Sequence, residues 1–118
     1  MGKTKFANIE FEIWFFVANL LIIILFYKNI ALTTVLLGIV AFIGLFKWNS
    51  FRTFCIFILA GIAFPVLEMI ASYFGVWHYA IFNIINIPFW LLIAWGNGGA
   101  FIYQTAKNFR ERRLIKNV

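Results

Sequence analysis

The stretch FCIFILAGIAFPVLEMIASYF, residues 54–74, decides the fold class of this 118-residue chain. About 20 apolar residues in a helix, rising about 1.5 Å each, cross the hydrocarbon core of a bilayer, so this stretch is long enough to span a membrane. It contains one charged residue, Glu68, which is also the only acidic residue between Ile13 and Arg110. A charged side chain at the centre of a membrane helix costs about 2.5–3.5 kcal/mol on insertion scales. Glu68 is therefore the first candidate for a functional residue.

The composition of the whole chain agrees with this stretch. Hydrophobic residues make up 64% of the chain and charged residues 12%, whereas a soluble domain has about 45–50% and about 25%. A water-soluble fold of this size could not bury so much apolar surface. The composition therefore predicts an integral membrane protein whose main partner is the lipid bilayer.

Four apolar segments predict an all-α membrane protein, a four-transmembrane-helix bundle that forms a single domain over residues 1–118. No charged residue lies between Met69 and Ala106, and that length is too great for one span. A turn near residues 75–83 is expected to divide it, because Gly75 can end a helix. The predicted helices cover residues 11–27, 30–46, 51–74 and 82–106, followed by a basic tail over residues 107–118.

The distribution of basic residues predicts the orientation in the membrane. The net charge of +6 comes from residues that flank the apolar segments and do not form one basic face, so we expect no nucleic-acid partner. Nine fall on one predicted side, and Lys28 alone falls on the other. The nine are Lys3, Lys5, Lys47, Arg52, Lys107, Arg110, Arg112, Arg113 and Lys116. By the positive-inside rule, both termini face the cytoplasm of a cell (inner) membrane, and the C-terminal tail meets anionic lipid headgroups.

Two stripes of residues predict where a polar site lies. In the third predicted helix, Gly61, Pro65, Glu68 and Ser72 share one face. The matching stripe of the fourth contains Asn86, Trp90, Ile93, Asn97, Ala100 and Gln104. Antiparallel pairing of the two helices would bring Glu68 level with Asn86 and Trp90, whose N–H groups could bond its carboxylate, and would leave Asn97 deeper.

The sequence thus predicts a polar intramembrane pocket in the outer half of the membrane. Its expected members are Glu68, Ser72, Tyr73, Asn86, Trp90 and Asn97, with Trp77, His78 and Tyr79 as secondary candidates. No metal site is predicted, because His78 has no second histidine or aspartate to complete a ligand set. No cofactor motif is present, and Glu10 and Glu12 are expected to face water or the interface.

One spacing is similar to a known pattern. The string Glu68-x6-Gly75-x-Trp77-x-Tyr79-x8-Pro88 resembles the acid–Gly–aromatic–Pro pattern of membrane carotenoid-modifying proteins over about a quarter of the chain. Those proteins are longer, and the paired carboxylates of the lycopene cyclases are missing here. We therefore assign no family from this spacing.

Three functions remain open from the sequence. The first is a non-enzymatic subunit or homo-oligomeric component of a membrane complex with a buried polar site around Glu68. The second is a small proton- or cation-coupled transporter or channel that uses Glu68. The third is a membrane enzyme that acts on a hydrophobic lipid or isoprenoid with Glu68 as general acid. The small number of polar residues and the lack of a catalytic set favour the first.

Overall fold

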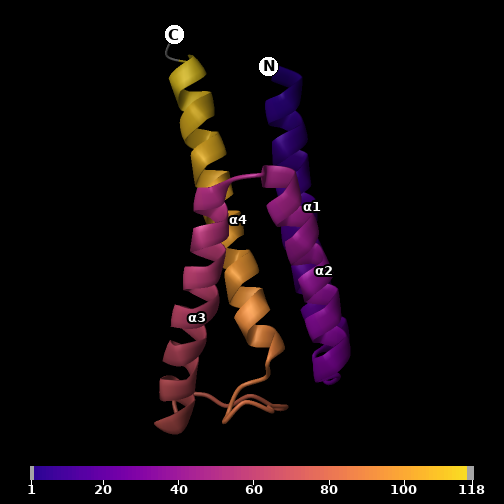
Figure 1. The fold of residues 1–118 in the computed structure, drawn as a ribbon, viewed down its shortest axis with the longest axis vertical. Helices are drawn as coiled ribbons and strands as arrows, with labels where there is room; N and C mark the ends of the chain where they lie inside the picture. The colour runs from indigo at the N-terminus through magenta and orange to yellow at the C-terminus, as the bar shows by residue number, and fades with distance from the viewer. Residues whose placement is uncertain (1, 117–118) are drawn as a thin grey trace.

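The chain forms four helices, shown in Figure 1. A computed structural model describes the backbone of residues 2–116 and the side chains of residues 9–111. The helices are α1 (Gly2–Phe26), α2 (Ile30–Trp48), α3 (Phe51–Tyr73) and α4 (Trp90–Lys116). Within the described residues there is no strand, and α1, α2 and α3 each contain a segment long and apolar enough to cross a membrane. The all-helical prediction is confirmed, and the three segments are Ile9–Phe26, Ile30–Trp48 and Phe51–Tyr73.

Two short polar turns join the first three helices. The Asn29 side chain accepts a hydrogen bond from the Leu32 amide at 3.1 Å and so caps the start of α2. Ser50 caps α3 in the same way, through the Thr53 amide at 3.2 Å, while Asn49 adopts the left-handed conformation that ends α2. Capping of this kind satisfies backbone groups that a helix end leaves unpaired. Such short connections make sequential helices antiparallel.

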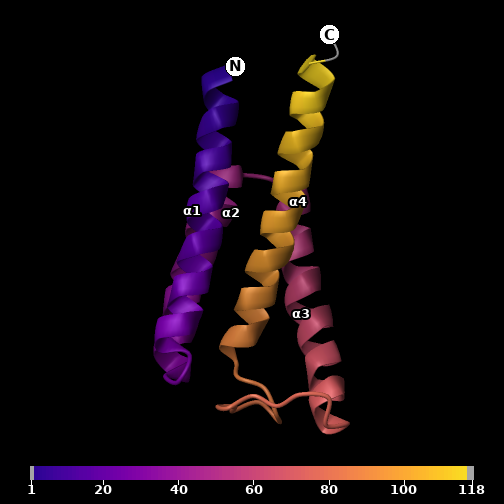
Figure 2. The same cartoon turned by 180° about the vertical axis from the view of Figure 1, so that it is seen from behind.

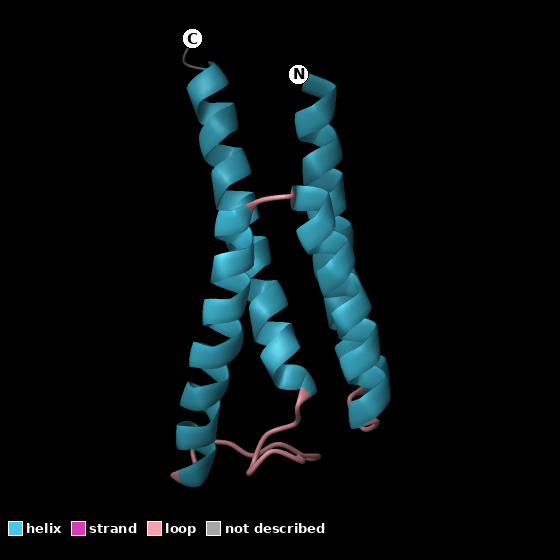
Figure 3. Cartoon of the chain, viewed as in Figure 1, coloured by secondary structure: helices cyan, strands magenta, loops and turns pink. Residues whose placement is uncertain are grey.

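Gly75 ends α3 in a Schellman motif. Its φ angle is +78°, a left-handed conformation that glycine adopts without steric penalty. The Gly75 amide bonds the Ser72 carbonyl at 3.1 Å, and the Val76 amide bonds the Ala71 carbonyl at 2.9 Å. The chain then leaves the helix as the non-helical loop drawn in pink between α3 and α4 in Figure 3.

The fourth helix begins at Trp90, later than the start near residue 82 that the sequence predicts. Pro88 disfavours helical geometry at the residue before it, Ile87. The Asn83 side-chain oxygen also accepts a hydrogen bond of 2.9 Å from the Phe89 backbone amide. The segment between them turns back on itself, with Ile84 and Ile87 paired and Ile85 at a φ of +55°. Asn86 consequently lies in a loop and not on a helix face.

Helix α4 occupies the centre of the bundle. It packs against each of the other three helices, whereas α1 and α3 make no direct backbone contact in the described part of the chain. Its approach to α3 is close, since a Cβ atom on Gly99 would lie 2.6 Å from the Ala60 Cβ, and one on Gly96 would lie 2.7 Å from the Phe57 ring. Small residues let two membrane helices approach in this way.

Both ends of the chain extend past the turn that joins α2 to α3. Helix α1 starts at Gly2, earlier than the predicted residue 11, and α4 continues through the predicted basic tail to Lys116. Figures 1 and 2 show that the two termini lie at the same end of the bundle as this turn, opposite the loop between α3 and α4. The molecule is accordingly elongated, with extents of 51 × 26 × 22 Å.

Candidate functional site

The Glu68 carboxylate holds the loop between α3 and α4. Its Oε2 atom accepts two hydrogen bonds of 2.7 Å, one from the Trp77 indole N–H and one from the Tyr79 hydroxyl. Glu68 lies five residues before Tyr73, the end of α3, which places it about 7.5 Å from the helix terminus. The carboxylate is half-buried and near the end of the bundle, where it joins a helix to a loop. We call Glu68, Trp77 and Tyr79 the loop clamp.

The clamp differs from the contacts that the sequence predicts. Asn86 does not bond Glu68; its side-chain amide donates to the Met69 carbonyl at 3.0 Å. Trp90 packs in the buried apolar cluster with Leu37, and its indole N–H has no hydrogen-bond partner among the described residues. Because α4 begins only after Pro88, the donors that reach Glu68 are the two secondary candidates of the loop and not the residues of α4.

Tyr79 is the more buried donor of the clamp. It packs partly against the apolar cluster around Leu37 and Trp90, while the Trp77 side chain is 47% exposed. Burial, together with the hydrogen bond to Glu68 and its charge, raises the pKa of Tyr79 well above its usual range. The Tyr79 hydroxyl therefore stays protonated, as a hydrogen-bond donor, over the physiological pH range.

The other predicted members do not gather around Glu68. Ser72 is buried, and its hydroxyl has no hydrogen-bond partner in the part of the chain that the structure describes. Tyr73 is 80% exposed, and His78, although between the two clamp donors, is exposed as well. Asn97 is buried deep in the bundle as a member of a different set of contacts. The predicted single pocket is thus divided into a loop clamp and separate contacts between helices.

Asn97 joins three helices. Its side-chain amide donates to the Asn19 side chain of α1 at 2.7 Å and to the Leu37 carbonyl of α2 at 3.3 Å. Asn19 in turn donates to the Phe15 carbonyl at 2.7 Å, one turn earlier in α1. One turn beyond Ala100, the buried Gln104 side chain donates to the Thr53 hydroxyl of α3. Polar side chains at such positions bond neighbouring membrane helices to one another.

Glu12 is buried, contrary to the expectation that it faces water. Its side chain is 3% exposed, with Oε1 bonded by the Asn108 side-chain amide and Oε2 bonded by the Thr105 hydroxyl at 3.3 Å. The exposed Glu10 does follow the expectation. Asn108 continues the polar stripe of α4 by one turn beyond Gln104, so the sequence does carry a signal for this contact. The stripe predicted from the sequence stops at Gln104 because the fourth helix is predicted to end at residue 106.

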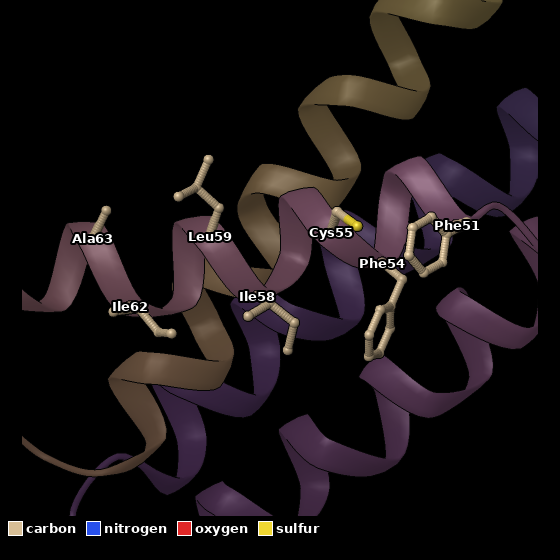
Figure 4. A pocket seen from close by; sticks show the side chains of 7 residues that line it. All are labelled: Phe51, Phe54, Cys55, Ile58, Leu59, Ile62 and Ala63. Atoms are coloured by element: carbon tan, nitrogen blue, oxygen red, sulfur yellow. The ribbon is translucent and has the colours of Figure 1, made fainter.

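The described grooves on the outside of α3 are lined almost entirely by apolar side chains. Figure 4 shows one of about 400 Å³, formed by α3 alone and including the free thiol of Cys55. Its other lining residues are Phe51, Phe54, Ile58, Leu59, Ile62 and Ala63. A second groove of about 560 Å³ lies between α3 and α4. Glu68 lines neither of these two grooves.

The chain has no match among known protein families, curated proteins or solved structures. Its buried and half-buried polar side chains nonetheless share one role in the structure. Glu68, Glu12, Asn97 and Gln104 all bond donors or acceptors that belong to other elements of the same chain. What this arrangement can do chemically is to fix helices and the loop against one another.

Proposed function

We propose that this small polytopic membrane protein acts as a non-enzymatic component of a membrane assembly, as a subunit or as a homo-oligomer. The observation that carries the proposal is the loop clamp. The Glu68 carboxylate, the one acid of the central apolar stretch, accepts two donors from its own chain on one oxygen. A carboxylate bonded in this way supports the shape of an outer loop, which is a surface suited to contact with another subunit.

The clamp favours this proposal over the two alternatives that depend on Glu68. A proton or cation carrier needs its carboxyl along a path through the membrane, and Glu68 lies near one end of α3. A general acid needs its carboxyl within hydrogen-bond reach of the substrate. The apolar grooves that would suit a lipid substrate are lined by other residues.

Assembly would use large apolar side chains. The small residues that bring membrane helices together, Gly61, Gly96 and Gly99, already face the contact between α3 and α4. The outer faces of the helices expose residues such as Phe42 and Phe46, at 71% and 78%. These faces meet lipid acyl chains or the helices of another subunit.

We also infer that α4 crosses the membrane, with both termini in the cytoplasm. Helix α4 runs beside α3 over the same depth, and its polar residues face the other helices, which explains why it is less apolar than α1, α2 and α3. Lys47 and Arg52 lie at the end of the bundle that carries both termini. In a cysteine-free background, a cysteine at His78 should react with an impermeant maleimide in intact cells. A cysteine at Lys47 should react only after permeabilisation, and the reverse pattern would overturn the orientation.

The test of function compares three forms of the protein in native membranes and after purification in mild detergent. Wild type should purify as a species larger than the 13.7 kDa monomer, or with a stoichiometric partner. Glu68→Gln keeps an acceptor oxygen and should retain this assembly, whereas Glu68→Ala should weaken it. A protein that purifies alone as a monomer, and whose Glu68→Gln form loses pH-coupled flux in liposomes, would show that the carboxyl serves transport. Accumulation of a precursor lipid in cells that lack the protein would show an enzyme.

A further inference from the structure

The groove between α3 and α4 is a hollow bounded by two helices. Its volume is about 560 Å³, in the size range of small-molecule sites. Three of its residues have little or no side chain, Ala60 and Ala63 on α3 and Gly99 on α4. These small residues let the two helices meet closely at the floor of the groove, and larger apolar side chains border it. Such a shape accepts a linear apolar chain lying parallel to the helices.

One end of this groove leads to basic side chains. Ile56 lines the groove on α3, and Arg52 precedes it by four residues, on the same helix face. Tyr103 lines the groove on α4, and Lys107 follows it by four residues, again on the same face. Because the helices are antiparallel, both steps lead toward the end of the bundle with the termini and the turn between α2 and α3 (Figure 1).

A hydrogen bond fixes the heights of these basic residues relative to one another. The Gln104 side chain bonds Thr53 across the two helices. Arg52 is adjacent to Thr53, and Lys107 is three residues from Gln104, so both lie within about one helical turn of this bond. Arg52 is exposed and Lys107 is partly exposed, which leaves both ammonium and guanidinium groups accessible. The start of α3 adds the partial positive charge of a helix N-terminus.

We propose that this groove binds one anionic phospholipid, with an acyl chain along α3 and α4 and the headgroup phosphate at Arg52 and Lys107. The apolar groove matches the acyl chain of such a lipid, and the basic residues at its end match the negatively charged headgroup. Arginine offers a planar pair of donors to a phosphate, and lysine adds a point charge. The opposite end of the groove lies near Phe64, an apolar residue, so the lipid has one orientation.

Lipid titration followed by native mass spectrometry tests this site on the purified full chain. The probes are phosphatidylglycerol and phosphatidylcholine with identical acyl chains. The double variant Arg52→Gln/Lys107→Gln should weaken phosphatidylglycerol binding by about thirtyfold, the equivalent of about 1 kcal/mol for each basic residue. It should weaken phosphatidylcholine binding less, because the choline cation offsets the charge of that lipid's phosphate. The matched control is Lys28→Gln/Lys47→Gln, which removes the same charge away from the groove. Lys28 lies at the other end, and Lys47 lies over the Phe11 ring of α1. Equal losses in the two double variants would overturn the proposal.

A second pair of variants tests the acyl half of the site independently of charge. Ala63→Trp places an indole in the groove and should weaken phosphatidylglycerol binding, whereas Ala31→Trp, at an exposed position on α2, should leave it unchanged. Equal binding by these two variants would show that no chain occupies the groove. Inorganic phosphate should fail to displace phosphatidylglycerol; displacement at comparable concentration would show a simple anion site and would also overturn the proposal.

Discussion

Replacing Glu68 with alanine should release the first part of the loop between α3 and α4 and leave the second part in place. The variant removes the acceptor of both clamp hydrogen bonds. A hydrogen bond to a charged group contributes about 1.5–3 kcal/mol when buried, and less where water can replace the lost partner. We assign about 1.5 kcal/mol to the partly buried Tyr79 and about 0.5 kcal/mol to Trp77, whose side chain is 47% exposed. The sum of about 2 kcal/mol raises the population of the open loop about thirtyfold.

Limited proteolysis with chymotrypsin measures that population, because cleavage follows the open form when opening is fast relative to cleavage. Cuts after Tyr79 and Phe82 should accelerate about thirtyfold in Glu68→Ala, by the free energy assigned to the two bonds. The bonds from Asn86 to Met69 and from Phe89 to Asn83 do not involve Glu68, so the region after residue 83 should remain resistant.

Two further variants separate the clamp from general loosening of the protein. Tyr79→Phe keeps the cleavage site but loses one clamp bond, so it should accelerate cleavage less than Glu68→Ala does. Tyr73→Phe is the matched control, since Tyr73 is 80% exposed and its hydroxyl donates no hydrogen bond to the described residues. Unchanged cleavage in Glu68→Ala, or equal acceleration in the two tyrosine variants, would refute the reasoning.

Two other features give separate predictions. The raised pKa of Tyr79 means that the folded state favours the protonated phenol. The protonated Tyr79 therefore contributes its full share of the folding stability below about pH 10, and this share falls as the pH rises above about 10. In a tyrosinate absorbance titration, one of the four tyrosines should ionise later than the others, and Tyr79→Phe should remove that late step. Gly99→Ala should lower stability by about 1–3 kcal/mol, because the new Cβ would lie 2.6 Å from that of Ala60. A Cβ at Gly98 would have no neighbouring atom within 4 Å, so Gly98→Ala should be neutral or stabilising by up to about 1 kcal/mol in thermal unfolding. Equal effects of the two glycine variants on stability would contradict the close packing at Gly99.

The helices are predictable from the sequence because their signals are local. Apolar runs of membrane-spanning length give α1, α2 and α3, and the short polar segments at Asn29 and Ser50 supply their caps. The start of α4 is not predictable from hydrophobicity, because residues 82–89 are as apolar as a helix. The conformation there depends on Pro88 and on a side-chain bond from Asn83, and the second of these is visible only in the folded chain.

The hydrogen-bond partners of Glu68 are likewise not predictable from local sequence signals. Counting helical rise from Gly75 and Asn83 assumes a helix on both sides of the turn, and it therefore matches Glu68 with Asn86 and Trp90. The chain forms a non-helical loop beyond Gly75, and this loop brings Trp77 and Tyr79 back to Glu68 instead. The sequence marks Trp77 and Tyr79 as side chains suited to a membrane–water interface and as secondary candidates for the pocket. Their hydrogen bonds to Glu68 are not visible in the sequence, because these contacts depend on the path of the loop.

The polar residues of α4 explain how one helix can serve as the centre of a bundle of apolar helices. Lipid and helix faces are equally apolar, so burial alone does not select which face of α4 meets which neighbour. Bonds across membrane helices contribute only about 0.6 kcal/mol each on average, yet each requires one particular rotation and height. Asn97 meets α1 and α2, Gln104 meets α3, and Asn108 meets Glu12 of α1. Three such contacts at successive levels fix the register of α4, and the same register sets Lys107 and Arg52 within about one helical turn of the bond between Gln104 and Thr53.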